Sequence, residues 1–166
     1  MNVPSRMSNL HEILLLLGRL NYTWTNTESL LIYLIAGLAS VDKEKAAVIF
    51  LTLNTTRARI DLVERLAKLK STPADCRQEV LSLTRSLLRE AGLRNKFNHC
   101  IYSFDPENGR GMTQMMRIAD SKDEIRYGKV ESLDEAEVQR IRDCIASLGT
   151  INRDVWQLVG RYDFPT

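Results

Sequence analysis

Apolar residues recur at three- and four-residue steps along the first half of the chain, which is the spacing of amphipathic helices. The first such stretch covers residues 8–39, with Ser8 as its expected N-cap. The second covers residues 43–70 and follows Asp42, a residue type that caps helix N-termini. The pattern therefore predicts two long helices joined by a short connection.

Two further helices are expected later in the chain. Thr72-Pro73 begins the third, because a capping side chain followed by proline is typical of a helix start. Gly92 either ends or kinks this helix. The fourth begins at Ser132, whose side chain is expected to form a capping box with Glu135.

The segment 105–131 has a different pattern, because its Asp-Pro, Asn-Gly and Arg-Gly dipeptides are turn signals. Two short runs within it, 112–118 and 124–130, are expected to pair as a hairpin whose tip is Asp120–Asp123. The predicted fold class is all-α, an antiparallel four- to five-helix bundle with a small β-hairpin insertion before the last helix. We expect residues 1–166 to form a single domain.

Composition narrows the class of protein. The 23 basic and 21 acidic residues leave a net charge of +2, so contact with nucleic acid has to be local. The three cysteines, Cys76, Cys100 and Cys144, lack metal-ligand spacing and indicate reduced thiols in a cytoplasmic protein. The apolar runs 13–17 and 30–39 are shorter than the roughly 20 residues that cross a bilayer. We expect no signal peptide, membrane span, metal or cofactor.

The stretch LRNKFNHCIYSF, residues 93–104, places one of the chain's two histidines, His99, five residues after Arg94. The Arg94 guanidinium is a planar fork that suits phosphate oxygens, and His99 can transfer a proton near neutral pH. Together they suffice for attack of an RNA 2′-hydroxyl on its own phosphodiester, with no metal. Five residues on an ideal helix turn through about 140°, which would separate the two side chains. The reach of the arginine, a kink at Gly92 or a two-fold dimer could bring them together.

Arg94-Asn95, three residues and then His99 resembles the signature of the HEPN (higher eukaryote and prokaryote nucleotide-binding) superfamily, and the order of helices is similar too. The resemblance implies an α-helical, usually dimeric protein, often a metal-independent endoribonuclease of toxin–antitoxin, phage-defence or RNA-processing systems. It implies that Arg94 and His99 form the catalytic pair and that Asn95 orients them. Asn98 and Cys100 stand where the family often has a small residue and a glycine.

Five other residues are weaker candidates for the site. Asn98 lies inside the motif, and Asn21 and Glu28, seven residues apart on the first helix, could point into a cleft beside the motif and steer His99. Arg57 and Arg59 could contact phosphates, although a solvated helix face explains them as well. Each also has a purely structural reading, as a boundary, turn or capping residue.

The sequence therefore favours a metal-independent endoribonuclease, with RNA, a second copy of the chain and an antitoxin or nucleotidyltransferase-type protein as expected partners. The alternative is a non-catalytic helical module of the same fold that binds RNA, a nucleotide or a protein. A third reading is a plain helical scaffold, in which His99 is a capping or partly buried side chain.

Overall fold

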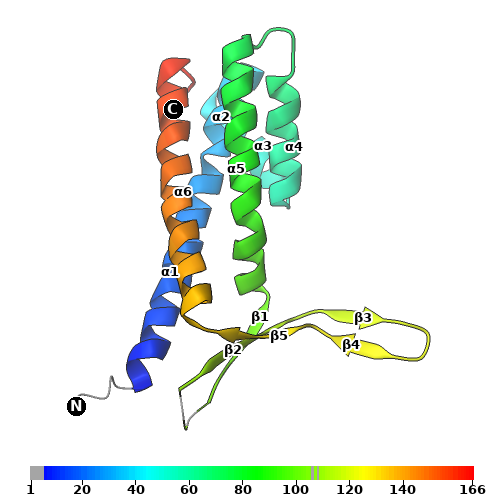
Figure 1. The fold of residues 1–166 in the computed structure, drawn as a ribbon. Coiled ribbons are helices and arrows are strands. Elements are labelled where there is room, and N and C mark those ends of the chain that lie inside the picture. The colour runs from blue at the N-terminus through cyan, green and yellow to red at the C-terminus, as the bar shows by residue number, and fades with distance from the viewer. Residues whose placement is uncertain (1–5, 106, 108) are drawn as a thin grey trace. The chain divides into compact units, whose positions relative to one another are not determined.

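The computed structural model describes residues 6–105, 107 and 109–166, and Figure 1 shows the order of its elements. The helices are α1 (Arg6–Ser29), α2 (Leu31–Ala39), α3 (Lys43–Thr52), α4 (Thr56–Ala67), α5 (Ala74–Asn98) and α6 (Glu135–Arg161). The strands are β1 (Cys100–Phe104), β2 (Gly111–Met115), β3 (Ile118–Asp120), β4 (Ile125–Tyr127) and β5 (Val130–Leu133). None of the described helices is long and apolar enough to span a membrane.

The chain divides into two compact units. Unit 1 contains the described residues up to Tyr22 together with Gly92–Ile145, and unit 2 contains Thr23–Ala91 and Ala146–Thr166. Unit 2 is helical, and its apolar side chains form a core that is almost closed to solvent. The largest members of that core are Trp24, Leu34, Ile35, Ile60, Val63, Val80, Leu148 and Leu158. That one domain covers residues 1–166 stays a prediction.

Two helices of unit 2, α3 and α4, begin at capping side chains. Asp42 Oδ1 accepts from the Lys45 N–H at 2.8 Å, as expected for the N-cap of α3. The predicted helix over 43–70 is nevertheless wrong in extent, because the chain leaves the helix after Thr52. Thr55 then caps a new helix, its Oγ1 accepting from the Ala58 N–H at 3.1 Å. Likewise the helix over 8–39 is two helices that meet at Leu30, and Ser8 lies inside α1.

The predicted all-α class is wrong, because unit 1 contains five strands in two small antiparallel sheets among its described residues. The larger sheet has the order β1-β2-β5, with Tyr102 opposite Thr113 and Thr113 opposite Glu131. The physical reason is the period-two pattern of β1, in which Cys100, Tyr102 and Phe104 are more buried than the residues between them. The predicted hairpin accounts for only part of this region.

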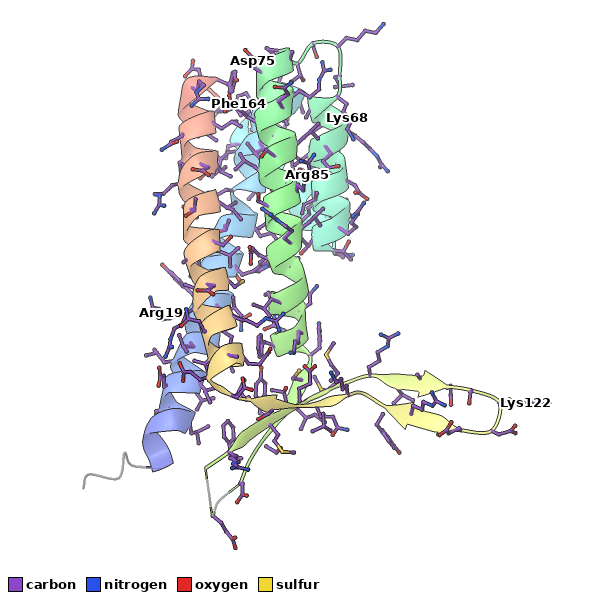
Figure 2. The ribbon with its side chains drawn as sticks, in the orientation of Figure 1. Arg19, Lys68, Asp75, Arg85, Lys122 and Phe164 are labelled. Carbon is purple, nitrogen blue, oxygen red and sulfur yellow. The ribbon has the colours of Figure 1, made fainter. Side chains whose placement is uncertain are left out.

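The smaller sheet is a ribbon in which β3 pairs with β4, Ile118 lying opposite Tyr127. Every strand residue in it is exposed. Where the ribbon joins the larger sheet, a Cβ on Gly128 would lie 2.0 Å from the Met115 carbonyl oxygen. Only glycine permits that close approach of the two backbones. Figure 2 labels Lys122 at the far tip of the ribbon.

The start of α6 also differs from the predicted capping box. Ser132 lies in β5, opposite Met112, so its backbone is extended rather than helical. Asp134 takes the capping position, and its Oδ1 accepts from the Glu137 N–H at 3.0 Å. A strand that needs Ser132 as a pairing partner therefore displaces the helix start to Glu135.

Candidate functional site at the end of α5

The helix α5 is continuous through Gly92, so Arg94 and Asn95 lie on its last turns. The final turn closes where the His99 N–H donates to the carbonyl oxygens of Asn95 at 3.1 Å and Lys96 at 3.3 Å. His99 itself lies in the turn that leads into β1. The rotation expected between Arg94 and His99 on an ideal helix therefore does not apply, since His99 has left the helix.

Asparagine side chains hold the Arg94 guanidinium. Its Nη1 donates to Asn95 Oδ1 at 3.0 Å. With the amide oxygen of Asn98 turned toward Arg94, that oxygen accepts from Nε at 2.9 Å and from Nη2 at 3.1 Å. In this orientation the Asn98 amide nitrogen donates to Asn21 Oδ1 at 2.8 Å, and Asn21 Nδ2 donates to the Leu17 carbonyl at 3.2 Å. We call Asn21, Asn95 and Asn98 the asparagine clamp.

The clamp orients a charged group with neutral partners from α1 and α5. Asn98 contacts Arg94 because residues four apart lie on one face of a helix. Asn95 follows Arg94 directly and reaches the other side of the guanidinium. Asn21, on α1, accepts the hydrogen bond from the Asn98 amide nitrogen. Spacing along the helix indicates the contact between Asn98 and Arg94. Asn21 was expected to lie beside the motif and steer His99, and it instead bonds to Asn98.

The His99 side chain is exposed, and its imidazole forms no hydrogen bond within the described part of the chain. Its backbone is fixed on both sides, because its carbonyl oxygen also accepts from the Met116 N–H at 2.7 Å. An exposed imidazole on a fixed backbone differs from the buried or capping histidine of the scaffold reading. It is accessible to a substrate.

An ion-pair cluster that the sequence did not predict supports the end of α5. Lys96 Nζ lies 2.5 Å from a carboxylate oxygen of Glu131 on β5 and 2.8 Å from one of Glu137 on α6. Hydrogen bonds from Lys96 and then Lys129 lower the pKa of Glu131 from 4.5 to about 2. The cluster joins three elements of unit 1, and its members are too far apart in the chain for sequence spacing to reveal it.

Cys100 adjoins His99 but is not positioned as a nucleophile. Its Sγ donates to the Lys96 carbonyl oxygen at 2.9 Å, and only 7% of the residue is exposed. Burial raises the pKa of the thiol, which disfavours the reactive thiolate. The described residues also contain no group of three His, Cys, Asp or Glu side chains that could hold a metal ion.

Two of the weaker candidates, Glu28 and Arg59, bond to each other in unit 2. Glu28 is 8% exposed, and its Oε1 accepts from Thr56 Oγ1 at 2.5 Å and lies 3.2 Å from Arg59 Nη1. Its Oε2 accepts from the Trp24 indole N–H at 3.2 Å. The Glu28 carboxylate is therefore satisfied on both oxygens by side chains of its own unit.

Arg59 is equally occupied within unit 2. Its Nε donates to the carbonyl oxygens of Phe50 at 3.3 Å and Leu53 at 3.0 Å, and its guanidinium lies 4.1 Å from the centre of the Phe50 ring. Arg57 is exposed and pairs with Asp61 one helical turn later, at 2.9 Å. These contacts are sufficient to explain both arginines as structural residues.

Comparisons of the chain with protein-family models, with curated proteins and with solved structures found no match. Function is therefore inferred from side-chain geometry together with the resemblance of the Arg94–His99 motif to the HEPN signature.

Proposed function

We propose that the chain is a metal-independent endoribonuclease of HEPN type, with its active site at the end of α5. One observation carries the proposal: the asparagine clamp orients the Arg94 guanidinium close in sequence to an exposed imidazole, that of His99, on a fixed backbone. A guanidinium of fixed orientation suits the tetrahedral array of phosphate oxygens.

The chemistry requires only groups of the chain, groups of the RNA and water. The 2′-oxygen of the substrate forms a bond to phosphorus while the bond from phosphorus to the 5′-oxygen breaks. His99 accepts the proton of the attacking 2′-hydroxyl, and the leaving 5′-oxygen takes up a proton from water. His99 then returns its proton to the hydroxide that remains. Arg94 stabilises the charge that develops on the phosphate oxygens. The products are a 2′,3′-cyclic phosphate and a 5′-hydroxyl.

The resemblance to the HEPN superfamily also suggests where such an activity would operate. A toxin or defence enzyme of this type acts in the cytoplasm, as a homodimer, and is restrained by an antitoxin or a nucleotidyltransferase-type partner. In the present chain Asn95 and Asn98 position Arg94 rather than contact the reacting atoms. Neither Glu28 nor Arg59 belongs to the proposed site, because the two side chains form an ion pair with each other and Arg59 also bonds to the Leu53 carbonyl in unit 2.

Binding without cleavage is a second candidate, and the exposed apolar side chains of the β3–β4 ribbon favour it. A groove of about 360 Å³ at the root of the ribbon is lined by Ile101, Met115, Met116, Ile118 and Tyr127. Exposed apolar patches of this kind are typical of interaction sites. A module that binds a partner or an RNA through this surface would need neither Arg94 nor His99.

The test is cleavage of a mixed RNA pool in the presence of EDTA by the native protein, His99→Ala and Arg85→Ala. Arg85 is an exposed arginine on the same helix and serves as the matched control (Figure 2). We expect cleavage by the native protein and Arg85→Ala, and none by His99→Ala. Equal cleavage by all three proteins would indicate a contaminating nuclease, and RNA binding without cleavage by any of them would favour the binding module.

A further inference from the structure

The exposed face of β1 includes His99. Cys100 is buried and Ile101 is exposed, so the side chains of this strand alternate between core and solvent. His99, one residue before Cys100, is exposed like Ile101. On the neighbouring strand, Met115 pairs with Cys100, and the next residue, Met116, donates its N–H to the His99 carbonyl oxygen at 2.7 Å. His99 and Met116 therefore extend the register of β1 and β2 by one pair.

Three side chains next to His99 on this face line a single groove. Directly opposed residues of an antiparallel pair point to the same side of a sheet, with Cβ atoms about 4.5–5.5 Å apart. The register places Met116 opposite His99 and Gln114 opposite Ile101. Met116, Gln114 and Ile101 all line the groove of about 360 Å³ at the root of the β3–β4 ribbon. The groove therefore begins beside His99.

The remaining walls of the groove suit a flat aromatic ligand. Ile118 and Tyr127 lie opposite each other in the ribbon, and both line the groove. Tyr127 is 71% exposed, which leaves most of its ring open to a ligand. Aromatic rings stack on nucleobases of any sequence, because every base has a π-face. A volume of about 360 Å³ lies near the lower end of the range of about 300–1,000 Å³ for ligand pockets, as expected for a single base.

The polar groups of the groove are few, and they suit a nucleotide. Gln114 Nε2 donates to the Gly128 carbonyl oxygen at 3.4 Å, which holds the amide against the groove. The Gln114 amide oxygen forms no hydrogen bond within the described part of the chain, so it can accept from an N–H of a base edge. Arg117 is the one charged residue among those that line the groove. A nucleotide supplies a phosphate for this arginine, whereas an apolar protein side chain would leave it without a counter-charge.

We propose that this groove binds a base of the RNA substrate, that of the nucleotide whose 2′-hydroxyl attacks the phosphate. The inference rests on the proposed nuclease function. His99 accepts the proton of that hydroxyl, so the ribose that carries it lies against His99 in the complex. The base is attached to C1′, which is bonded directly to the C2′ that carries the hydroxyl. The base of this nucleotide therefore lies in the immediate vicinity of His99, where the groove begins.

The groove would act on binding and base preference rather than on the chemical step. Its side chains contact the base, which does not change during the reaction, so the contact is present before and after the attack. The nucleotide in the groove becomes the 3′ end of the upstream fragment, where it carries the 2′,3′-cyclic phosphate. Any base preference of the groove is therefore recorded at that end of the product.

Binding of uncleavable single strands tests the groove apart from catalysis. The probes are two fluorescein-labelled oligonucleotides of equal length and charge, a mixed-sequence 2′-deoxy strand and its abasic counterpart. Neither has a 2′-hydroxyl, so the proposed reaction cannot cut them. Measured by fluorescence anisotropy, the native chain should bind the base-bearing strand at least about fivefold more tightly than the abasic strand. Tyr127→Ala should lose this preference, and Tyr127→Phe should restore it because the ring remains.

Ile125→Ala is the matched control. Ile125 is exposed on the same strand as Tyr127 but does not line the groove, so this variant should keep the native preference. On RNA in EDTA, Tyr127→Ala should raise KM at least about fivefold and change kcat less, because it removes a contact made before the transition state. The 3′-terminal bases of the upstream fragments should be closer to the composition of the RNA pool for Tyr127→Ala than for the native chain.

Two results would overturn the proposal. The first is equal affinity of the native chain for the base-bearing and abasic strands. The second is a Tyr127→Ala variant that keeps both a native circular dichroism spectrum and the native preference. If the native chain cuts RNA in either case, the nuclease stands and only the base site is wrong. Base-dependent binding that Tyr127→Ala loses, without cleavage of RNA by the native chain, would support the groove as a base site and refute the nuclease.

Discussion

Two arginines of this chain, Arg59 in unit 2 and Arg94 in unit 1, are held in contrasting ways. Arg59 is 18% exposed at its side chain and meets a carboxylate, two backbone carbonyls and an aromatic ring. Arg94 is half-buried, and the asparagine clamp orients it through uncharged amides. The contacts of Arg59 include a counter-charge, whereas the clamp fixes the direction of the Arg94 guanidinium.

The contrast teaches that the partners of an arginine, more than its position on a helix, indicate its role. A carboxylate at 3.2 Å repays the cost of burying Arg59 and ties α4 to α1 within unit 2. Amide oxygens hold a guanidinium without cancelling its charge, so Arg94 can still attract a phosphate. The predictions that follow test this difference, from the largest expected effect to the smallest.

Arg94→Ala should lower RNA cleavage about a thousandfold, because the variant loses the charge that stabilises the phosphate in the transition state. The free energy of unfolding should change by less than about 1 kcal/mol, since Arg94 is half-buried and its hydrogen bonds to Asn95 and Asn98 are bonds to neutral amides. Single-turnover rates and urea unfolding measure the two quantities. A variant that is destabilised but still cleaves at the native rate would make Arg94 a structural residue like Arg59.

Arg59→Ala should lower the free energy of unfolding by about 3 kcal/mol, because it leaves the buried Glu28 carboxylate without its counter-charge. Urea unfolding measures the loss. Arg57→Ala is the matched control on the same helix, and its exposed pair with Asp61 should be worth less than about 0.5 kcal/mol. Equal effects of the two substitutions would contradict the structural role of Arg59.

Asn98→Ala should lower the rate of RNA cleavage about tenfold, which corresponds to about 1.4 kcal/mol in the barrier. The charge of Arg94 remains in this variant, but the guanidinium loses the oxygen that accepts from Nε and Nη2. A comparison of kcat with KM shows whether orientation or binding has changed. An unaltered rate would mean that the clamp does not position Arg94 for catalysis.

The cluster around Lys96 should make the end of α5 sensitive to acid. Because the pKa of Glu131 is about 2 in the folded chain and 4.5 ordinarily, its carboxylate stabilises the fold above pH 4.5. That contribution is lost as the pH falls from 4.5 toward 2. Urea midpoints at pH 7 and in acid should therefore fall further for the native chain than for Glu131→Gln. An equal fall in both proteins would contradict this contribution of Glu131.

Local signals in the sequence predicted part of the fold correctly. Asp42 caps α3 as expected, since a cap depends only on a side chain and the next three residues. The helix is interrupted at residues 53–55, where Thr55 is a capping residue type. The apolar stripe continues through this interruption, and for that reason the pattern predicted one helix. The alternation in β1 was present in the sequence too, but it is only five residues long.

Contacts over long distances in the chain could not be predicted in the same way. Ser132 and Glu135 have the spacing of a capping box. Pairing of Ser132 with Met112 in the sheet overrides that local preference. In the candidate site, the motif identified Arg94, Asn95 and His99, and helical spacing brings in Asn98. Tertiary packing brings Asn21 against Asn98. It also brings Glu131 and Glu137 against Lys96.

The most direct test of the difference between the two arginines is the chemistry of the RNA ends after incubation in EDTA with native protein, Arg94→Ala or Arg59→Lys. We predict fragments with a 2′,3′-cyclic phosphate and a 5′-hydroxyl from the native protein and from the folded fraction of Arg59→Lys. Arg94→Ala should give these fragments about a thousandfold more slowly. Fragments with the same ends and in the same yield from folded Arg94→Ala would contradict the assignment of Arg94 to the active site.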